Sequence, residues 1–140
     1  ESLMIVATGN PSLYAGVNPL TPALLSRFTG EVRPNPKPEE IKRILNWEGL
    51  PLGSVIEPLL TITSNSHDMC VQNNVDYELS PRDLDQFIEM YNDNVEMGVS
   101  PQLNLIHCIK SCILIKYNGD PTEYESMRIR CEETFGVGIT

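Results

Sequence analysis

The chain has 140 residues, of which 41% are apolar, so it can bury a core in one domain or in two small units. Its formal net charge of −9 argues against a free-standing nucleic-acid-binding protein, because such proteins normally carry a basic surface. No apolar run approaches the roughly 18–20 residues of a membrane-spanning helix, and no basic flank precedes the first apolar residues as in a signal peptide. We therefore expect an intracellular protein, in the cytoplasm or the nucleus.

A short apolar run opens the chain. The run from Leu3 to Ala7 is followed by Gly9, Asn10 and Pro11. An uninterrupted apolar run bounded by turn-forming residues is typical of a strand buried on both faces, as in a parallel sheet. We expect Asn10 at the carboxyl end of this strand, which is where open α/β sheets bind ligands.

A helix and a proline-rich connector come next. Thr21-Pro22 predicts a helix start, because threonine caps helices and proline suits the first helical position. This helix should end near Gly30, just after Arg27 and Phe28. A second short strand is expected at 31–33. Since Pro34, Pro36 and Pro38 stiffen the segment that follows, we place a domain boundary between residues 1–35 and 36–140.

The rest of the chain is predicted to be all-helical. Apolar residues at helical spacing predict helices over 38–47, 54–72, 81–95, 101–114 and from 121 onward. The second of these contains Pro58, which we expect in its first turn. Ser80-Pro81, Ser100-Pro101 and Asp120-Pro121 are typical helix starts, with a capping residue followed by proline. The helix from Pro101 is apolar nearly all round, which predicts a central position.

Four cysteines leave two interpretations open. Cys108 and Cys112 are four residues apart and share one face of a predicted helix, and His107 precedes them. A metal or redox site would need more converging ligands, because His67 is distant in sequence. Buried core cysteines are therefore favoured, and we predict no metal site.

The stretch from Ile5 to Phe28 resembles the AAA+ ATPases of the midasin, dynein-related and MoxR group. In that group a strand ends in a sensor asparagine before proline, and a glycine-containing loop, a Leu-x-Pro helix start and an arginine before phenylalanine follow. The matching residues here are Asn10-Pro11, Gly16, Leu20-Thr21-Pro22 and Arg27-Phe28. The family's helical lid carries a sensor arginine at a helix start, often as Ser-Pro-Arg, and Arg82 stands in that place. The resemblance covers roughly residues 3–95.

The resemblance implies a mainly α chain, in which a short α/β remnant of a P-loop core precedes an all-helical lid. Asn10 would orient the attacking water. Arg27 would be an arginine finger that stabilises the transferring phosphate of a neighbour's ATP, and Arg82 would bind the phosphate in its own module. The implied function is to sense ATP and to complete a site whose hydrolysis remodels a macromolecular target. The implied partners are other AAA+ subunits in a ring and a protein substrate, without direct contact to nucleic acid or membrane.

Two parts of an ATP site are absent from the sequence. It has no Gly-x-x-x-x-Gly-Lys-Ser/Thr loop to cradle phosphates and no strand ending in Asp-Glu to hold Mg²⁺. We expect both to precede residue 1 in an intact module, which would bind ATP and Mg²⁺. The chain alone should bind neither and should not hydrolyse ATP.

Each sensor residue also has an ordinary structural explanation. Asn10-Pro11 can be a simple turn, Arg27 a solvated residue near a helix end, and Arg82 an exposed residue paired with Asp83 or Asp85. The alternative function is accordingly a non-catalytic helical module for protein interaction, with vestigial sensor residues.

Overall fold

The structure is a computed structural model that describes residues 3–9, 18, 21–28, 38–44 and 53–139. These residues are mainly helical and contain no strand. The helices are α1 (Pro22–Leu25), α2 (Pro38–Ile44), α3 (Gly53–Val71), α4 (Pro81–Glu96), α5 (Pro101–Cys108) and α6 (Pro121–Phe135). A π-helix, η1 (Ile109–Ile113), and a 3₁₀-helix, η2 (Leu114–Tyr117), follow α5. Within this part of the chain, no helix is both long and apolar enough to cross a membrane.

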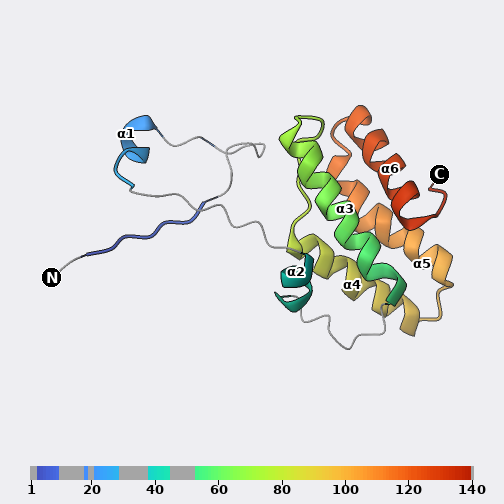
Figure 1. Cartoon of the computed structure of the whole chain (residues 1–140). Helices are drawn as coiled ribbons and strands as arrows, with labels where there is room; N and C mark the ends of the chain where they lie inside the picture. Colours follow the sequence, from blue (N-terminus) through green and yellow to red (C-terminus); the bar gives the residue numbers. More distant parts are fainter. Residues whose placement is uncertain (1–2, 10–17, 19–20, 29–37, 45–52, 140) are drawn as a thin grey trace.

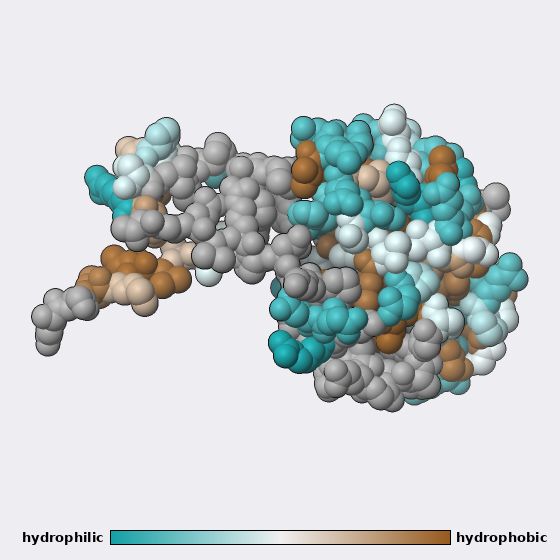
Figure 2. Space-filling model, in the orientation of Figure 1, coloured by the Kyte–Doolittle hydropathy of each residue, from teal (hydrophilic) through white to brown (hydrophobic). Residues whose placement is uncertain are grey.

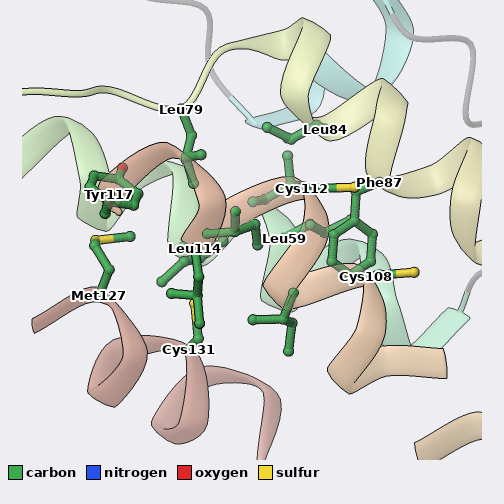
Figure 3. Packing of buried hydrophobic residues seen from close by; sticks show 14 of the residues in the cluster. Leu59, Leu79, Leu84, Phe87, Cys108, Cys112, Leu114, Tyr117, Met127 and Cys131 are labelled. Atoms are coloured by element: carbon green, nitrogen blue, oxygen red, sulfur yellow. The ribbon is translucent and has the colours of Figure 1, made fainter. Parts of the chain in front are cut away.

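The helices from α3 to α6 form a bundle around one hydrophobic core (Figure 1). In it α3 packs against α6, while α4 packs against α5 and η1. The core is filled by large side chains from different elements, among them Leu59, Phe87, Leu114 and Met127 (Figure 3). Full burial of one such side chain contributes roughly 1.5–3 kcal/mol. Ile41 of α2 also belongs to this core.

Helix α4 begins where the sequence predicts it. Ser80 accepts a hydrogen bond from the Asp83 N–H, and the Asp83 carboxylate accepts one from the Ser80 N–H, so the two residues form a capping box. Pro81 takes the first helical position, where its missing N–H costs nothing. Leu84, Phe87 and Ile88 then lie buried at helical spacing.

The predicted helix over 101–114 consists of three pieces. After α5 the chain forms η1 and then η2, so the regular hydrogen-bonding pattern of an α-helix is interrupted. The buried residues of this segment are Asn104, Cys108, Ile109, Cys112, Ile113, Leu114 and Tyr117. The predicted central position is confirmed for one face of η1 and η2 only, because Lys110, Ser111, Ile115 and Lys116 are exposed. In the first turn of α5, Asn104 is buried but Leu103 is 64% exposed, so the prediction of a segment buried nearly all round is wrong.

Pro58 lies inside α3 and not in its first turn, so that prediction is wrong. Proline cannot donate the hydrogen bond to the carbonyl four residues earlier, which belongs to Ser54. Ser54 is exposed. Water can therefore bond this carbonyl, and the apolar face of α3 stays intact.

The predicted strand over 3–7 is not formed. Residues 3–9 have no regular secondary structure, and Leu3, Met4, Ile5 and Val6 are 71–87% exposed. A strand requires hydrogen-bonding partners, and the described residues offer it none. The α/β remnant is therefore not supported. Figure 2 shows this apolar segment apart from the largely hydrophilic surface of the bundle.

For the first part of the chain, the structure confirms the predicted start of the helix at Thr21-Pro22 and corrects its end. Thr21 caps α1 as predicted, and its hydroxyl accepts from the Leu24 N–H at 3.3 Å. The helix ends at Leu25, earlier than the predicted end near Gly30. The predicted strand at 31–33 and the boundary after residue 35 lie outside the described residues, and that boundary stays a prediction.

Candidate functional site

The structure describes two of the three predicted sensor residues. Arg82 is exposed and lies in the first turn of α4. Arg27 is also exposed and lies in the turn after α1, where its N–H donates to the Leu24 carbonyl at 3.1 Å. Figure 1 shows α1 apart from α4, so the structure does not bring the two arginines together. Asn10 lies outside the described residues.

A buried carboxylate lies directly beside Arg82. The side chain of Asp83 is only 4% exposed. Its Oδ2 accepts from the Tyr77 hydroxyl at 2.8 Å, and from the Ser80 N–H and hydroxyl at 2.9 Å each. Its Oδ1 lies 3.3 Å from Nζ of Lys116, which belongs to η2. We call Tyr77, Ser80, Asp83 and Lys116 the Asp83 cluster.

The Asp83 cluster keeps this carboxylate ionised. Burial alone would raise the pKa of Asp83, but hydrogen bonds from Ser80 and Tyr77 and the charge of Lys116 together lower it. Burial and the neighbouring carboxylate raise the pKa of Tyr77 to about 12, so its hydroxyl stays protonated and can donate. The Lys116 ammonium also lies 5.8 Å from the centroid of the Tyr77 ring, within cation–π range.

The cluster changes how Arg82 can act. Asp83 bonds Lys116, and among the described ion pairs none joins Arg82 to Asp83 or Asp85. In the ordinary alternative Arg82 is an exposed arginine paired with one of these acids; its exposure is observed, but the pairing is not seen among the described ion pairs. The capping box satisfies the Asp83 N–H, and beside it Arg82 exposes its guanidinium, which is suited to binding an anion.

The segment that leads into α4 is tethered to three other elements. The Tyr117 hydroxyl of η2 donates to the Tyr77 carbonyl at 2.8 Å. Two contacts reach α3, from the Leu79 N–H to the Ser66 hydroxyl at 3.0 Å and between His67 and Glu78 at 2.8 Å. One contact reaches α6, from the Asp76 N–H to the Glu123 carboxylate at 3.0 Å. These bonds hold the base from which Arg82 projects.

A buried polar pair between α4 and α5 was not predicted from the sequence. Asn94 Nδ2 donates to Asn104 Oδ1 at 2.8 Å, and Asn104 Nδ2 donates to the Tyr91 carbonyl at 2.9 Å. Asn94 Nδ2 also lies 3.3 Å from His107 Nδ1 and 3.9 Å from Cys108 Sγ. The one available signal was the position of Asn94 on the apolar face of α4, three residues after Tyr91.

This grouping of amide, imidazole and thiol is not suited to nucleophilic catalysis. Cys108 is fully buried, and that burial raises the pKa of its thiol to about 12. The thiolate is the reactive form, so Cys108 is inert near neutral pH. All four cysteines are buried and free, as the core interpretation predicts. Among the described residues, no three His, Cys, Asp or Glu side chains are grouped to hold a metal ion.

Comparison of the chain with protein-family models, curated proteins and solved structures found no match. The candidate site is therefore defined by its own residues. At its centre is Arg82, an exposed arginine at a helix start that the buried Asp83 carboxylate and several hydrogen bonds hold in place.

Proposed function

We propose that this chain is the C-terminal part of an AAA+ ATPase module, which senses ATP and completes the site where ATP is hydrolysed to remodel a macromolecular target. The observation that carries the proposal is Arg82, exposed in the first turn of α4 beside the buried Asp83. A cation in the first turn is unfavourable against the helix dipole, and such local conflicts are typical of functional residues.

The Asp83 cluster supports a phosphate-binding role for Arg82. A guanidinium group binds two phosphate oxygens with its planar fork, and the binding is strongest when the arginine projects from a rigid base. Asp83 and Lys116 provide that base, because they join the start of α4 to η2. The position of the bundle would then depend on whether Arg82 contacts a phosphate.

The exposed segment at the start of the chain also supports the proposal. Leu3, Met4, Ile5 and Val6 form an apolar run with no cover among the described residues. Such a run is an aggregation hazard unless it joins a sheet. In the proposed module a parallel sheet of the nucleotide-binding core covers it and positions Asn10 at the ATP site, and Arg27 reaches the ATP of a neighbouring subunit.

The test is ATP hydrolysis by the full-length protein that carries this chain. Arg82→Ala should lower kcat by about a hundredfold or more, since the loss of one fixed donor to the developing charge of a transition state costs about 10²–10³ in kcat. Arg130→Ala is the matched control, because Arg130 is an exposed arginine on α6. Equal kcat values for the two variants would contradict the role of Arg82.

A second candidate function is a non-catalytic module for protein interaction. It is favoured by three exposed apolar residues near the turn between α4 and α5, namely Val95, Met97 and Leu103. Exposed apolar groups of this kind can mark interaction sites. This function would be preferred if full-length protein with Arg82→Ala hydrolysed ATP at the unaltered rate.

A further inference from the structure

The end of the described chain folds back into the bundle. Gly136 ends α6 in the left-handed conformation, with φ of 67°, and so reverses the chain direction. Val137 then packs against the core, and Ile139 is buried to 1% exposure. The segment from Val137 to Ile139, which we call the tail, is thus anchored mainly by Ile139, with Val137 packed beside the core.

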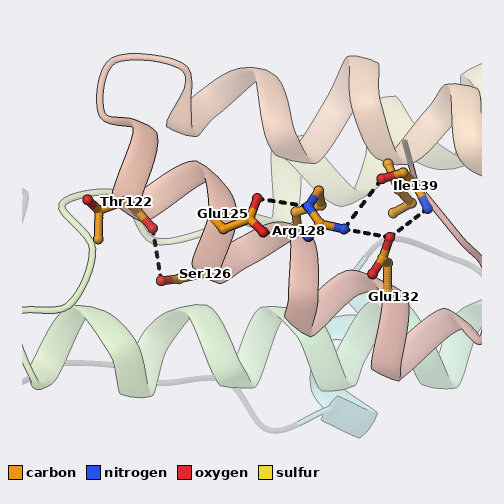
Figure 4. A network of polar contacts seen from close by, with 6 residues as sticks. All are labelled: Thr122, Glu125, Ser126, Arg128, Glu132 and Ile139. Atoms are coloured by element: carbon orange, nitrogen blue, oxygen red, sulfur yellow. Dashed lines mark hydrogen bonds and ion pairs between the residues drawn. The ribbon is translucent and has the colours of Figure 1, made fainter.

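Two side chains of α6 bond the backbone of this anchor residue. The Glu132 carboxylate accepts from the Ile139 N–H at 2.7 Å, and Nη1 of Arg128 donates to the Ile139 carbonyl at 3.5 Å (Figure 4). The same Nη1 lies 2.7 Å from the Glu132 carboxylate. Glu125 bonds Nε and Nη2 of Arg128 and so fixes the orientation of the guanidinium.

This arrangement is a complete recognition site for one residue of a peptide. It presents an acceptor for the backbone N–H, a donor for the carbonyl and an apolar site for the side chain. Backbone bonds give affinity for any sequence, while the side-chain site selects the residue type. None of these contacts requires the anchor residue to belong to the same chain.

Gly138, the residue before Ile139, indicates which residue types the site accepts at that position. A Cβ placed on Gly138 would meet nothing within 4 Å, and Gly138 is not among the residues with positive φ. The site therefore accepts other residues at that position. Gly136 is different, because its left-handed conformation serves to turn the tail back on its own helix.

We propose that Arg128, Glu132 and the apolar site filled by Ile139 form a docking site for a peptide segment with a branched aliphatic residue, which the tail occupies within its own chain. The tail then acts as a built-in competitor. Tethering gives it an effective concentration on the order of millimolar, so a partner segment binds only when the tail is released or outcompeted. This inference does not depend on ATP hydrolysis.

The test uses the full chain with Ile139→Asp, which expels the tail because a buried carboxylate would lie beside Glu132. The probe is the acetylated peptide Gly-Val-Gly-Ile-Thr, the sequence of residues 136–140. Its binding is followed by the amide NMR resonances of Met127 and Glu132. We expect saturable shifts in this variant and at least tenfold weaker binding to the unaltered chain.

Two controls separate docking from non-specific association. A peptide with Ile139→Ser should bind the Ile139→Asp chain at least tenfold more weakly. Adding Glu132→Ala to that chain should remove the binding, while adding Glu133→Ala should not, because Glu133 is exposed on the same helix. Equal binding of the two peptides, or no saturation in millimolar peptide, would overturn the proposal.

A folding defect in the Ile139→Asp chain would still be informative. If the variant loses its cooperative thermal transition, the proposal requires that the Ile-containing peptide restore it, since the peptide would then fill the vacated site. Failure of that peptide to restore the transition would show that the tail is an inseparable part of the core, and the docking site would be rejected.

Discussion

At the scale of single residues, Asp83 has the most demanding environment in the candidate site. Its carboxylate is buried, and three hydrogen bonds and one ammonium group compensate for the lost water. A buried charge is tolerated only with such partners. Because Arg82 is the residue directly before Asp83, any loss of order at Asp83 reaches it directly.

The stability contributed by Asp83 should depend on pH. Its pKa is lowered in the folded state from an unfolded value of about 3.9, so the folded state binds the proton less readily. The stabilisation is therefore fully present above about pH 5 and is lost as the pH falls through the folded pKa. Asp83→Asn should cost about 2 kcal/mol at pH 7, and this cost should shrink steadily below about pH 4.

The measurement is urea unfolding of the unaltered chain and of the Asp83→Asn chain, from pH 7 down to pH 2.5. Asp85→Asn is the control, because Asp85 is an exposed acid on the same helix, and it should change the unfolding free energy by less than about 0.5 kcal/mol. A cost for Asp83→Asn that stays constant as the pH falls would show that the carboxylate charge does not matter.

At the scale of elements, local signals predicted the helix starts, whereas long-range packing decided the interior hydrogen bonding. The start of α4 at Pro81 was predictable because Ser80 and Asp83 cap it within a single turn. The change from α5 to η1 and η2 was not predictable. This interruption of the α-helix depends on how the bundle accommodates the inward-facing residues of that segment. The strand predicted over 3–7 failed for a related reason, since its formation depends on partner strands.

The capping bond of α4 can be tested against a matched serine. Ser80→Ala removes a hydroxyl that caps α4 and also bonds Asp83, and it should lower the unfolding free energy by about 1 kcal/mol. Ser100 occupies the same position before α5, but its side chain makes no capping bond. Ser100→Ala should therefore have little effect in the same denaturant titration. Equal losses of unfolding free energy in the Ser80→Ala and Ser100→Ala chains would contradict a stabilising role of the Ser80 hydroxyl.

At the scale of the whole molecule, the bundle provides a rigid base for Arg82, which we propose as a sensor residue. The helical character and the exposed position of Arg82 follow from its place after a capping serine and proline. The Asp83 cluster could not be predicted, because Tyr77 and Lys116 approach Asp83 only when η2 packs beside the start of α4. The ATP site itself cannot be assembled from these residues alone, since the proposal assigns its phosphate-binding loop to another part of the protein.

The central claim is that this chain completes an ATP site in a ring of subunits, and Arg27→Ala tests it most directly. In the full-length protein this variant should abolish ATP hydrolysis while leaving ATP binding unchanged, because the guanidinium acts on the developing charge of a neighbour's phosphate. Arg43→Ala, which alters an exposed arginine on α2, should leave both unchanged. Full turnover in the Arg27→Ala protein would contradict the account.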